Sequence, residues 1–242
     1  MKLVLYIYRK VRLIMKLVQN NKAFQKILLI ISGMVLCLFL AGCRDESTEH
    51  YNQGNILLEE GDYEQAISCF NMAIRINGRC AEAYEGRGRA YARIGQYDKA
   101  ITDYYKALRI DPKLVQAYFH RGIAYYKKGE YDRALSDYNK ALEKGLRSTG
   151  VYNNRGIIYE NKGEYDKAIS DYSKAIEMDK NYYKAYSNRG KIYWIKEKYD
   201  LAISDYIKAI GSGPGDANDY SNRGDAYYKK GEYDFAISDY TK

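Results

Sequence analysis

The sequence predicts an all-α protein built as an array of helical hairpins, and three observations support this fold class. A glycine recurs every 34 residues, at Gly54, Gly88, Gly122, Gly156, Gly190 and Gly224. An alanine keeps the same step, at Ala66, Ala100, Ala134, Ala168, Ala202 and Ala236. Within one copy, Tyr118, Gly122 and Tyr125 have the i, i+4, i+7 spacing of one helix face. Six copies in phase predict an α-solenoid in which each unit packs on its neighbours.

The N-terminal segment holds the basic excess of the chain. The net charge is +8, but residues 1–43 contain seven basic residues and no acidic residue. The rest of the chain is therefore close to neutral. A neutral array is not expected to bind nucleic acid, because such binding depends on neutralising phosphates.

An apolar run from Ile27 to Leu40 follows these basic residues. It is shorter than the ~20 residues of a spanning helix and is typical of a secretory signal. The run ends in Leu40-Ala41-Gly42-Cys43, which resembles the lipobox of bacterial lipoproteins. The resemblance implies that residues 1–42 are a signal peptide and that Cys43 is acylated. Residues 43–46 would then tether the chain to a bacterial lipid bilayer, facing the periplasm or the cell exterior.

The N-terminal interpretation has an alternative, an uncleaved anchor helix that extends through Cys43. The start of the chain is also open, because Met15 followed by Lys16, Lys22 and Lys26 gives a more ordinary leader. Two acyl chains make a stable anchor, since each buried CH₂ contributes ~0.8 kcal/mol. Arg44 stands where the lipoprotein family has its inner-membrane retention aspartate, which favours the outer membrane.

The helical period changes phase at a short turn in each copy, which predicts two antiparallel helices of about 13 residues. Glycines suited to a left-handed helix end occupy this turn, at Gly61, Gly95, Gly129, Gly163 and Gly231. Glu197 stands there in the fifth copy. A non-glycine in that conformation costs about 1 kcal/mol, so we expect the fifth turn to be altered.

The repeat resembles the tetratricopeptide repeat. The aromatic residues Tyr84, Tyr118, Tyr152, Tyr186 and Tyr220 carry this resemblance, together with the glycine and alanine series and the aromatics Phe70, Tyr104, Tyr138, Tyr172, Tyr206 and Tyr240. It assigns the copies to residues 47–80, 81–114, 115–148, 149–182, 183–216 and 217–242, the last being cut short. The resemblance implies a right-handed superhelix whose concave face is formed by the first helices.

An arginine stands where the family usually has leucine, and an aspartate recurs in the second helix. These residues are Arg87 with Asp103, Arg121 with Asp137, Arg155 with Asp171, Arg189 with Asp205 and Arg223 with Asp239. The first copy lacks both the arginine and the aspartate, and it has Gln53 and Cys69 in their places. The joint loss predicts a structural ion pair within each copy. Independent solvated charges are the alternative.

The face of each first helix that points away from the core varies between copies, as at Glu85, Asn153 and Ser187. Selection for a partner and relaxed drift both explain this variation. We expect a protein-binding groove with an apolar strip and basic flanks, formed by Arg89, Arg93, Phe119, Ile123, Tyr126, Lys127, Ile157, Lys191 and Trp194. Such a groove suits a peptide with hydrophobic anchors and acidic flanks. Chaperone-binding members of the family clamp a C-terminal carboxylate with lysine, asparagine and arginine at set groove positions, and this set is not found in three successive copies.

The sequence does not favour an enzyme. His50 and His120 are the only histidines, and no metal-ligand spacing, phosphate loop or nucleophile turn is found. No cofactor or metal is expected.

The chain ends at Lys242 inside the second helix of the sixth copy, without a polar capping helix. Repeat arrays normally need such a cap. The chain is therefore either a fragment or packs Ile237 and Tyr240 against another subunit.

The sequence thus predicts a lipid-anchored scaffold that binds a protein through its concave surface. It resembles the repeat lipoproteins that assist envelope or pilus assembly. A self-assembling envelope component joined through the last repeat is the alternative.

Overall fold

The computed structural model describes residues 46–214 and 216–242 of the chain. Cys43 and the expected signal peptide lie outside these residues. Among the described helices, none has the length and apolar character needed to cross a membrane. The chain divides into two compact units, Met1–Cys80 and Ala81–Lys242, which we call unit 1 and unit 2.

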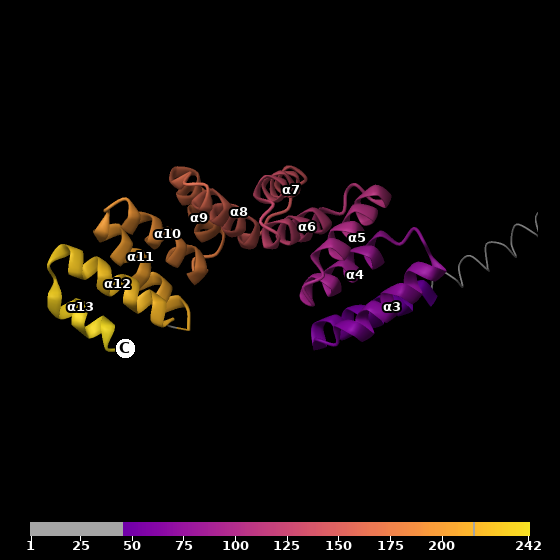
Figure 1. The fold of residues 1–242 in the computed structure, drawn as a ribbon, viewed down its shortest axis with the longest axis horizontal. Coiled ribbons are helices and arrows are strands. Elements are labelled where there is room, and N and C mark those ends of the chain that lie inside the picture. Colours follow the sequence, from indigo (N-terminus) through magenta and orange to yellow (C-terminus); the bar gives the residue numbers. More distant parts are fainter. Residues whose placement is uncertain (1–45, 215) are drawn as a thin grey trace, which may run out of the picture. The chain divides into compact units, whose positions relative to one another are not determined.

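The described residues form helices and no strands, which confirms the all-α prediction (Figure 1). Unit 1 contains a helix over residues 46–60 and α3 (Tyr63–Ile76). The helices of unit 2 are α4 (Ala81–Arg93), α5 (Tyr97–Ile110), α6 (Val115–Lys127), α7 (Tyr131–Glu143), α8 (Thr149–Asn161), α9 (Tyr165–Met178), α10 (Tyr183–Ile195), α11 (Tyr199–Ser212), α12 (Ala217–Lys230) and α13 (Tyr233–Tyr240). The even-numbered helices are the first helices of their hairpins, and the odd-numbered ones are the second.

The turn inside each hairpin is a left-handed helix end. At the third copy, Gly129 has a φ of 77°, and the amide of Glu130 donates to the carbonyl of Tyr125 at 2.9 Å. The expectation that the fifth turn is altered was wrong. Glu197 adopts a φ of 57°, and the amide of Lys198 donates to the carbonyl of Tyr193 at 2.8 Å. The hydrogen bonds of the turn therefore hold a non-glycine residue in the left-handed region.

The two helices of a hairpin touch through a glycine and an aromatic ring. A Cβ atom built on Gly122 would lie 2.6 Å from Cε1 of Tyr138. Tyr138 is fully buried, as are its counterparts Tyr104, Tyr172, Tyr206 and Phe70. The glycine thus makes room for the ring, and this close contact explains why both recur at one period.

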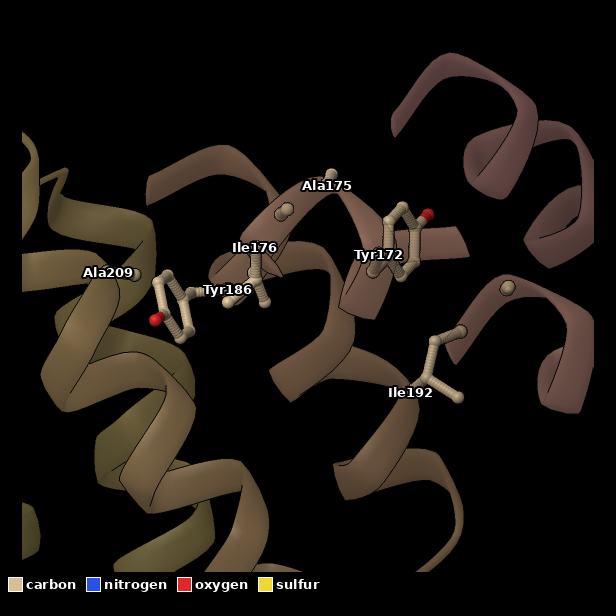
Figure 2. Packing of buried hydrophobic residues seen from close by; sticks show 8 residues of the cluster. Tyr172, Ala175, Ile176, Tyr186, Ile192 and Ala209 are labelled. Carbon is tan, nitrogen blue, oxygen red and sulfur yellow. The ribbon is translucent and has the colours of Figure 1, made fainter. Parts of the chain in front are cut away.

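Successive hairpins of unit 2 share their apolar cores. Figure 2 shows one cluster in which Tyr172, Ala175 and Ile176 of α9 meet Tyr186 and Ile192 of α10 and Ala209 of α11. Each first helix also contacts the next first helix, α4 with α6, α6 with α8, α8 with α10 and α10 with α12. The first helices of unit 2 therefore line one continuous surface.

A row of ion pairs joins each hairpin of unit 2 to the next. The lysine at the end of one first helix contacts the aspartate at the start of the preceding second helix, in the pairs Lys128–Asp98 (2.6 Å), Lys162–Asp132 (2.7 Å), Lys196–Asp166 (2.7 Å) and Lys230–Asp200 (2.8 Å). The aspartates are largely exposed, so water screens these pairs.

Candidate functional site

The repeated arginines and aspartates form ion pairs within their hairpins. Each guanidinium donates from Nε to Oδ2 and from Nη2 to Oδ1, at 2.7 to 2.8 Å, in Arg87–Asp103, Arg121–Asp137, Arg155–Asp171, Arg189–Asp205 and Arg223–Asp239. All five aspartates are buried. Two parallel hydrogen bonds to a planar guanidinium are the geometry that arginine provides and lysine does not.

Four of these arginines, Arg87, Arg155, Arg189 and Arg223, each contact two tyrosine rings of their own helix, and Arg121 contacts the ring of Tyr118. The guanidinium carbon of Arg155 lies 5.7 Å from the ring centre of Tyr152 and 5.9 Å from that of Tyr159. The hydrogen bond to Asp171 raises the pKa of Arg155, against the opposing effect of burial. These side chains are therefore engaged inside the hairpin and belong to the fold rather than to a ligand site.

The nine side chains of the predicted groove all lie on first helices of unit 2. Four of them, Arg89, Arg93, Ile123 and Lys127, line one pocket of about 390 Å³. Ala92, Tyr97, Tyr104 and His120 complete its wall. The pocket lies where the α4–α5 hairpin meets α6. Its lining combines three basic side chains with aromatic and aliphatic surface.

Ala92 is the smallest side chain in the lining of this pocket. Ala92 stands at a position where the later first helices carry Tyr126, Glu160, Trp194 and Tyr228. A large side chain in the place of Ala92 would occupy the space that Arg93 and Tyr97 border. The alanine is the sequence signal that could have located the pocket.

The other predicted groove residues lie outside this pocket. Phe119 packs against His120 and Tyr138, with ring centres 5.4 and 6.0 Å apart, and Tyr126 packs against Tyr131 at 5.7 Å. Ile157 is partly buried against the cluster around Tyr172. Phe119 and Tyr126 therefore contribute to packing within the α6–α7 hairpin, and Ile157 contributes to the apolar cluster formed by α9, α10 and α11.

Two predicted groove residues of α10 are held by neighbours. Lys191 forms an ion pair with Glu160 at 2.8 Å, so its charge is partly neutralised. Trp194 packs on the cluster around Tyr206, and its Nε1 is buried without a hydrogen-bond partner among the described residues. The basic flank predicted near Lys191 is therefore weaker than the sequence indicated.

Part of the predicted ligand face is buried between hairpins. Glu85 is buried and contacts His120, with Oε1 2.5 Å from Nδ1. Asn153 is also buried, and its Oδ1 accepts from Nδ2 of Asn188 at 3.1 Å. Ser187 donates to Asp219 at 2.5 Å. The sequence placed these three positions on the face that points away from the core, whereas each of them contacts the next first helix.

The described residues contain no group of three or more His, Cys, Asp or Glu side chains arranged to hold a metal ion. His120 is engaged with Glu85 and lies 5.4 Å from the Phe119 ring. The lining of the pocket offers positive charge, hydrogen-bonding groups and apolar surface.

Family models match most of the repeat region. A model described as tetratricopeptide repeat matches residues 47–80, 115–144 and 151–182. A second model with the same description matches residues 183–214, and one described as TPR repeat matches residues 88–129. A comparison with curated proteins gives no match.

Solved structures are also similar to this chain. One is described as YrrB, a TPR protein with an unusual peptide-binding site; its TM-score is 0.61 at 24% identity, covering 70% of this chain and 88% of that one. Pseudomonas aeruginosa pilF has a TM-score of 0.75 at 18% identity, covering 82% of this chain and 90% of that one. MamA has a TM-score of 0.60 at 25% identity, covering 74% and 97%. The first two likenesses show the fold alone.

Proposed function

This chain belongs to the tetratricopeptide-repeat family, and on that premise we propose that it is a scaffold that binds a partner protein through the first helices of unit 2. The observation that carries the proposal is the pocket between α4 and α6. Four side chains that the sequence assigned to a groove, Arg89, Arg93, Ile123 and Lys127, lie together around it. A concave patch with apolar surface and a few polar groups is typical of a binding site.

Two relatives support a peptide or protein as the ligand. The description of YrrB names a peptide-binding site, and another similar structure is the APC/C hetero-tetramer Cut9-Hcn1, at 20% identity and a TM-score of 0.69. The sequence of unit 2 agrees with such a role. Its core positions hold nearly the same residue in every copy, whereas one position on the first helices holds Arg89, Ile123 or Lys191, depending on the copy.

Site-specific photo-cross-linking tests the scaffold role. A benzoylphenylalanine at Lys127, on the rim of the pocket, is expected to form adducts with the partner in living cells. The matched control is Tyr105, which is 57% exposed on α5 and absent from the pocket lining. Equal adduct patterns from the two positions would remove the proposed binding surface.

The membrane anchor is a further part of the proposed function. Leu40-Ala41-Gly42-Cys43 supports acylation of Cys43 and a role in the cell envelope, where pilus assembly is one candidate process. Labelled palmitate should enter the wild-type chain and not a Cys43→Ser variant. Equal labelling of both chains would contradict lipidation at Cys43.

Self-association through α13 is a second candidate function. Ile237 and Tyr240 are 62% and 49% exposed, whereas their counterparts Ile203 and Tyr206 are 8% and 1% exposed. Sedimentation of the full chain in detergent should show concentration-dependent dimers that an Ile237→Lys variant loses. A monomer at every concentration would contradict this candidate.

A further inference from the structure

We propose that the α12–α13 hairpin is a pH-dependent switch, which packs against α11 when the carboxyl group of Asp219 is protonated and separates from α11 when that group is ionised. The hairpins from α4 to α11 stay packed in both states. The switch regulates which surface unit 2 presents, and it does not involve the pocket between α4 and α6.

Asp219 occupies a position at which the preceding first helices of unit 2 carry an apolar side chain. The equivalent residues are fully buried, and they are Ala83, Ala117, Val151 and Ala185. Asp219 is also buried, with 3% of its surface exposed. The interface of α12 with the preceding hairpin therefore encloses a carboxyl group where the earlier interfaces enclose an alanine or a valine. An ionised carboxylate is costly to bury without a charged partner.

The carboxyl group of Asp219 has one hydrogen-bond partner among the described residues. The hydroxyl of Ser187 on α10 donates to its Oδ1 at 2.5 Å. Burial raises the pKa of Asp219, the hydrogen bond from Ser187 opposes this effect, and the negative charge of Asp216 adds to it. None of these three influences is a positive charge. The ionised form of Asp219 is therefore disfavoured while the hairpin is packed.

The charged groups around this interface leave Asp219 without a counterion. Burial raises the pKa of Tyr206 on α11, and four neighbouring carboxylates add to this effect, those of Asp219, Asp225, Asp205 and Glu160. The basic side chains beside them are engaged elsewhere, because Arg189 pairs with Asp205 at 2.8 Å and Lys191 pairs with Glu160 at 2.8 Å. Asp225 accepts a hydrogen bond from the hydroxyl of Tyr240 at 2.7 Å. The surroundings of Asp219 are thus acidic.

The connection that leads into α12 provides little apolar anchoring. The connections before α6, α8 and α10 each place one side chain against a neighbouring apolar cluster, namely Leu114, Leu146 and Tyr182. Asp216 stands at the repeat position of Leu114 and Tyr182, and it is exposed. Its side chain accepts from the amide of Asn218 at 3.0 Å and caps α12. Fewer apolar contacts hold this hairpin, so the cost of one buried charge can decide whether it packs.

The direction of the pH dependence follows from these contacts. Protonated Asp219 stays buried beside Ser187, whereas ionised Asp219 is better solvated by water. Separation of the hairpin is therefore favoured as the pH rises through the interval between the pKa of Asp219 in the separated form and its higher pKa in the packed form. Separation uncovers Ile203 and Tyr206, which form one apolar cluster with Ala226 of α12.

Hydrogen exchange followed by mass spectrometry tests the switch on the full chain in detergent. Rates are measured at pH 4 and pH 7 and corrected for the intrinsic pH dependence of amide exchange. We expect the opening constant of the α12 amides to be about tenfold larger at pH 7, as for a buried charge with one neutral hydrogen-bond partner. The amides of α6 and α8 should open equally at both pH values.

Two variants link this opening to Asp219. Asp219→Ala gives α12 the residue that α10 carries as Ala185, so the α12 amides should open as rarely at pH 7 as at pH 4. Asp234→Ala removes an exposed carboxylate from the same hairpin and should keep the tenfold difference of the wild type.

Equal opening of the wild-type α12 amides at the two pH values would overturn the switch, and so would a pH difference that persists in Asp219→Ala. Opening of α6 and α8 together with α12 at pH 7 would also count against it, because the hairpin would then not separate by itself. Faster exchange confined to α13 would reject it as well, since a helix at the edge of an array can fray without any part played by Asp219.

Discussion

The guanidinium of Arg155 donates to both carboxylate oxygens of Asp171, with Nε–Oδ2 and Nη2–Oδ1 distances of 2.7 Å. The two residues are 16 positions apart and lie on the two helices of one hairpin. Their side chains are 15% and 4% exposed. Each hairpin of unit 2 thus ties its first helix to its second through a buried charge pair.

Removal of one partner of this pair is expected to be costly. Asp171→Ala should lower the free energy of unfolding by about 3–5 kcal/mol, because the arginine is left buried without its carboxylate. Arg155→Met combined with Asp171→Leu should recover most of the loss. A double-mutant cycle by chemical denaturation measures the coupling. The exposed pair Arg133–Glu130 serves as the control and should show little coupling.

The contact between glycine and tyrosine predicts different outcomes at two equivalent positions. A Cβ on Gly122 would lie 2.6 Å from Tyr138, whereas one on Gly190 would lie 3.1 Å from Tyr206. Gly122→Ala should lower the free energy of unfolding by about 1–2 kcal/mol, since overpacking exceeds the gain in helix propensity. Gly190→Ala should change it little. Equal losses in denaturant melts would contradict this explanation.

The fifth turn offers a stabilising substitution. Glu197 has a φ of 57°, which side-chain-bearing residues rarely adopt. Glu197→Gly should raise the free energy of unfolding by about 0.5–1 kcal/mol. The reverse change, Gly163→Ala at a φ of 72°, should lower it by about 1 kcal/mol. Thermal unfolding of both variants checks the pair, and a destabilised Glu197→Gly would show that its side chain has a further role.

Asp219 is expected to make stability depend on pH. It is 3% exposed, and burial raises its pKa above the usual 3.8, partly offset by the hydrogen bond from Ser187. Because the pKa is higher in the folded chain, folding takes up a proton between the unfolded and folded pKa values. The free energy of unfolding therefore falls as the pH rises through that interval.

Asp219→Asn should remove this contribution and stabilise the chain at neutral pH relative to the wild type. Denaturant melts across the acidic range measure the effect. Asp234→Asn, at an exposed position on α13, is the control for the loss of one carboxylate from the chain. If the free energy of unfolding of the wild type and that of Asp219→Asn vary with pH in the same way, water or Ser187 compensates the buried charge and the prediction is wrong.

Several features of the candidate site could not be derived from the sequence. The helical periodicity predicts that Arg89, Arg93, Ile123 and Lys127 lie on the surface of first helices. In the structure these four side chains line one pocket. The spacing within one helix does not say which side chains of the next hairpin they meet. The partners of Glu85 and Lys191, which are His120 and Glu160, depend on how neighbouring hairpins are packed.

The sequence by itself determined the repeat, the all-α class and the places of the hairpin turns, because these depend on contacts between residues close along the chain. Tertiary structure alone decided which side chains gather around the pocket, that Glu85 and Asn153 are buried, and that lysines such as Lys128 reach the aspartate of the preceding hairpin. The physical reason is that the angle and distance between stacked hairpins come from side-chain packing across the interface. No local spacing encodes them.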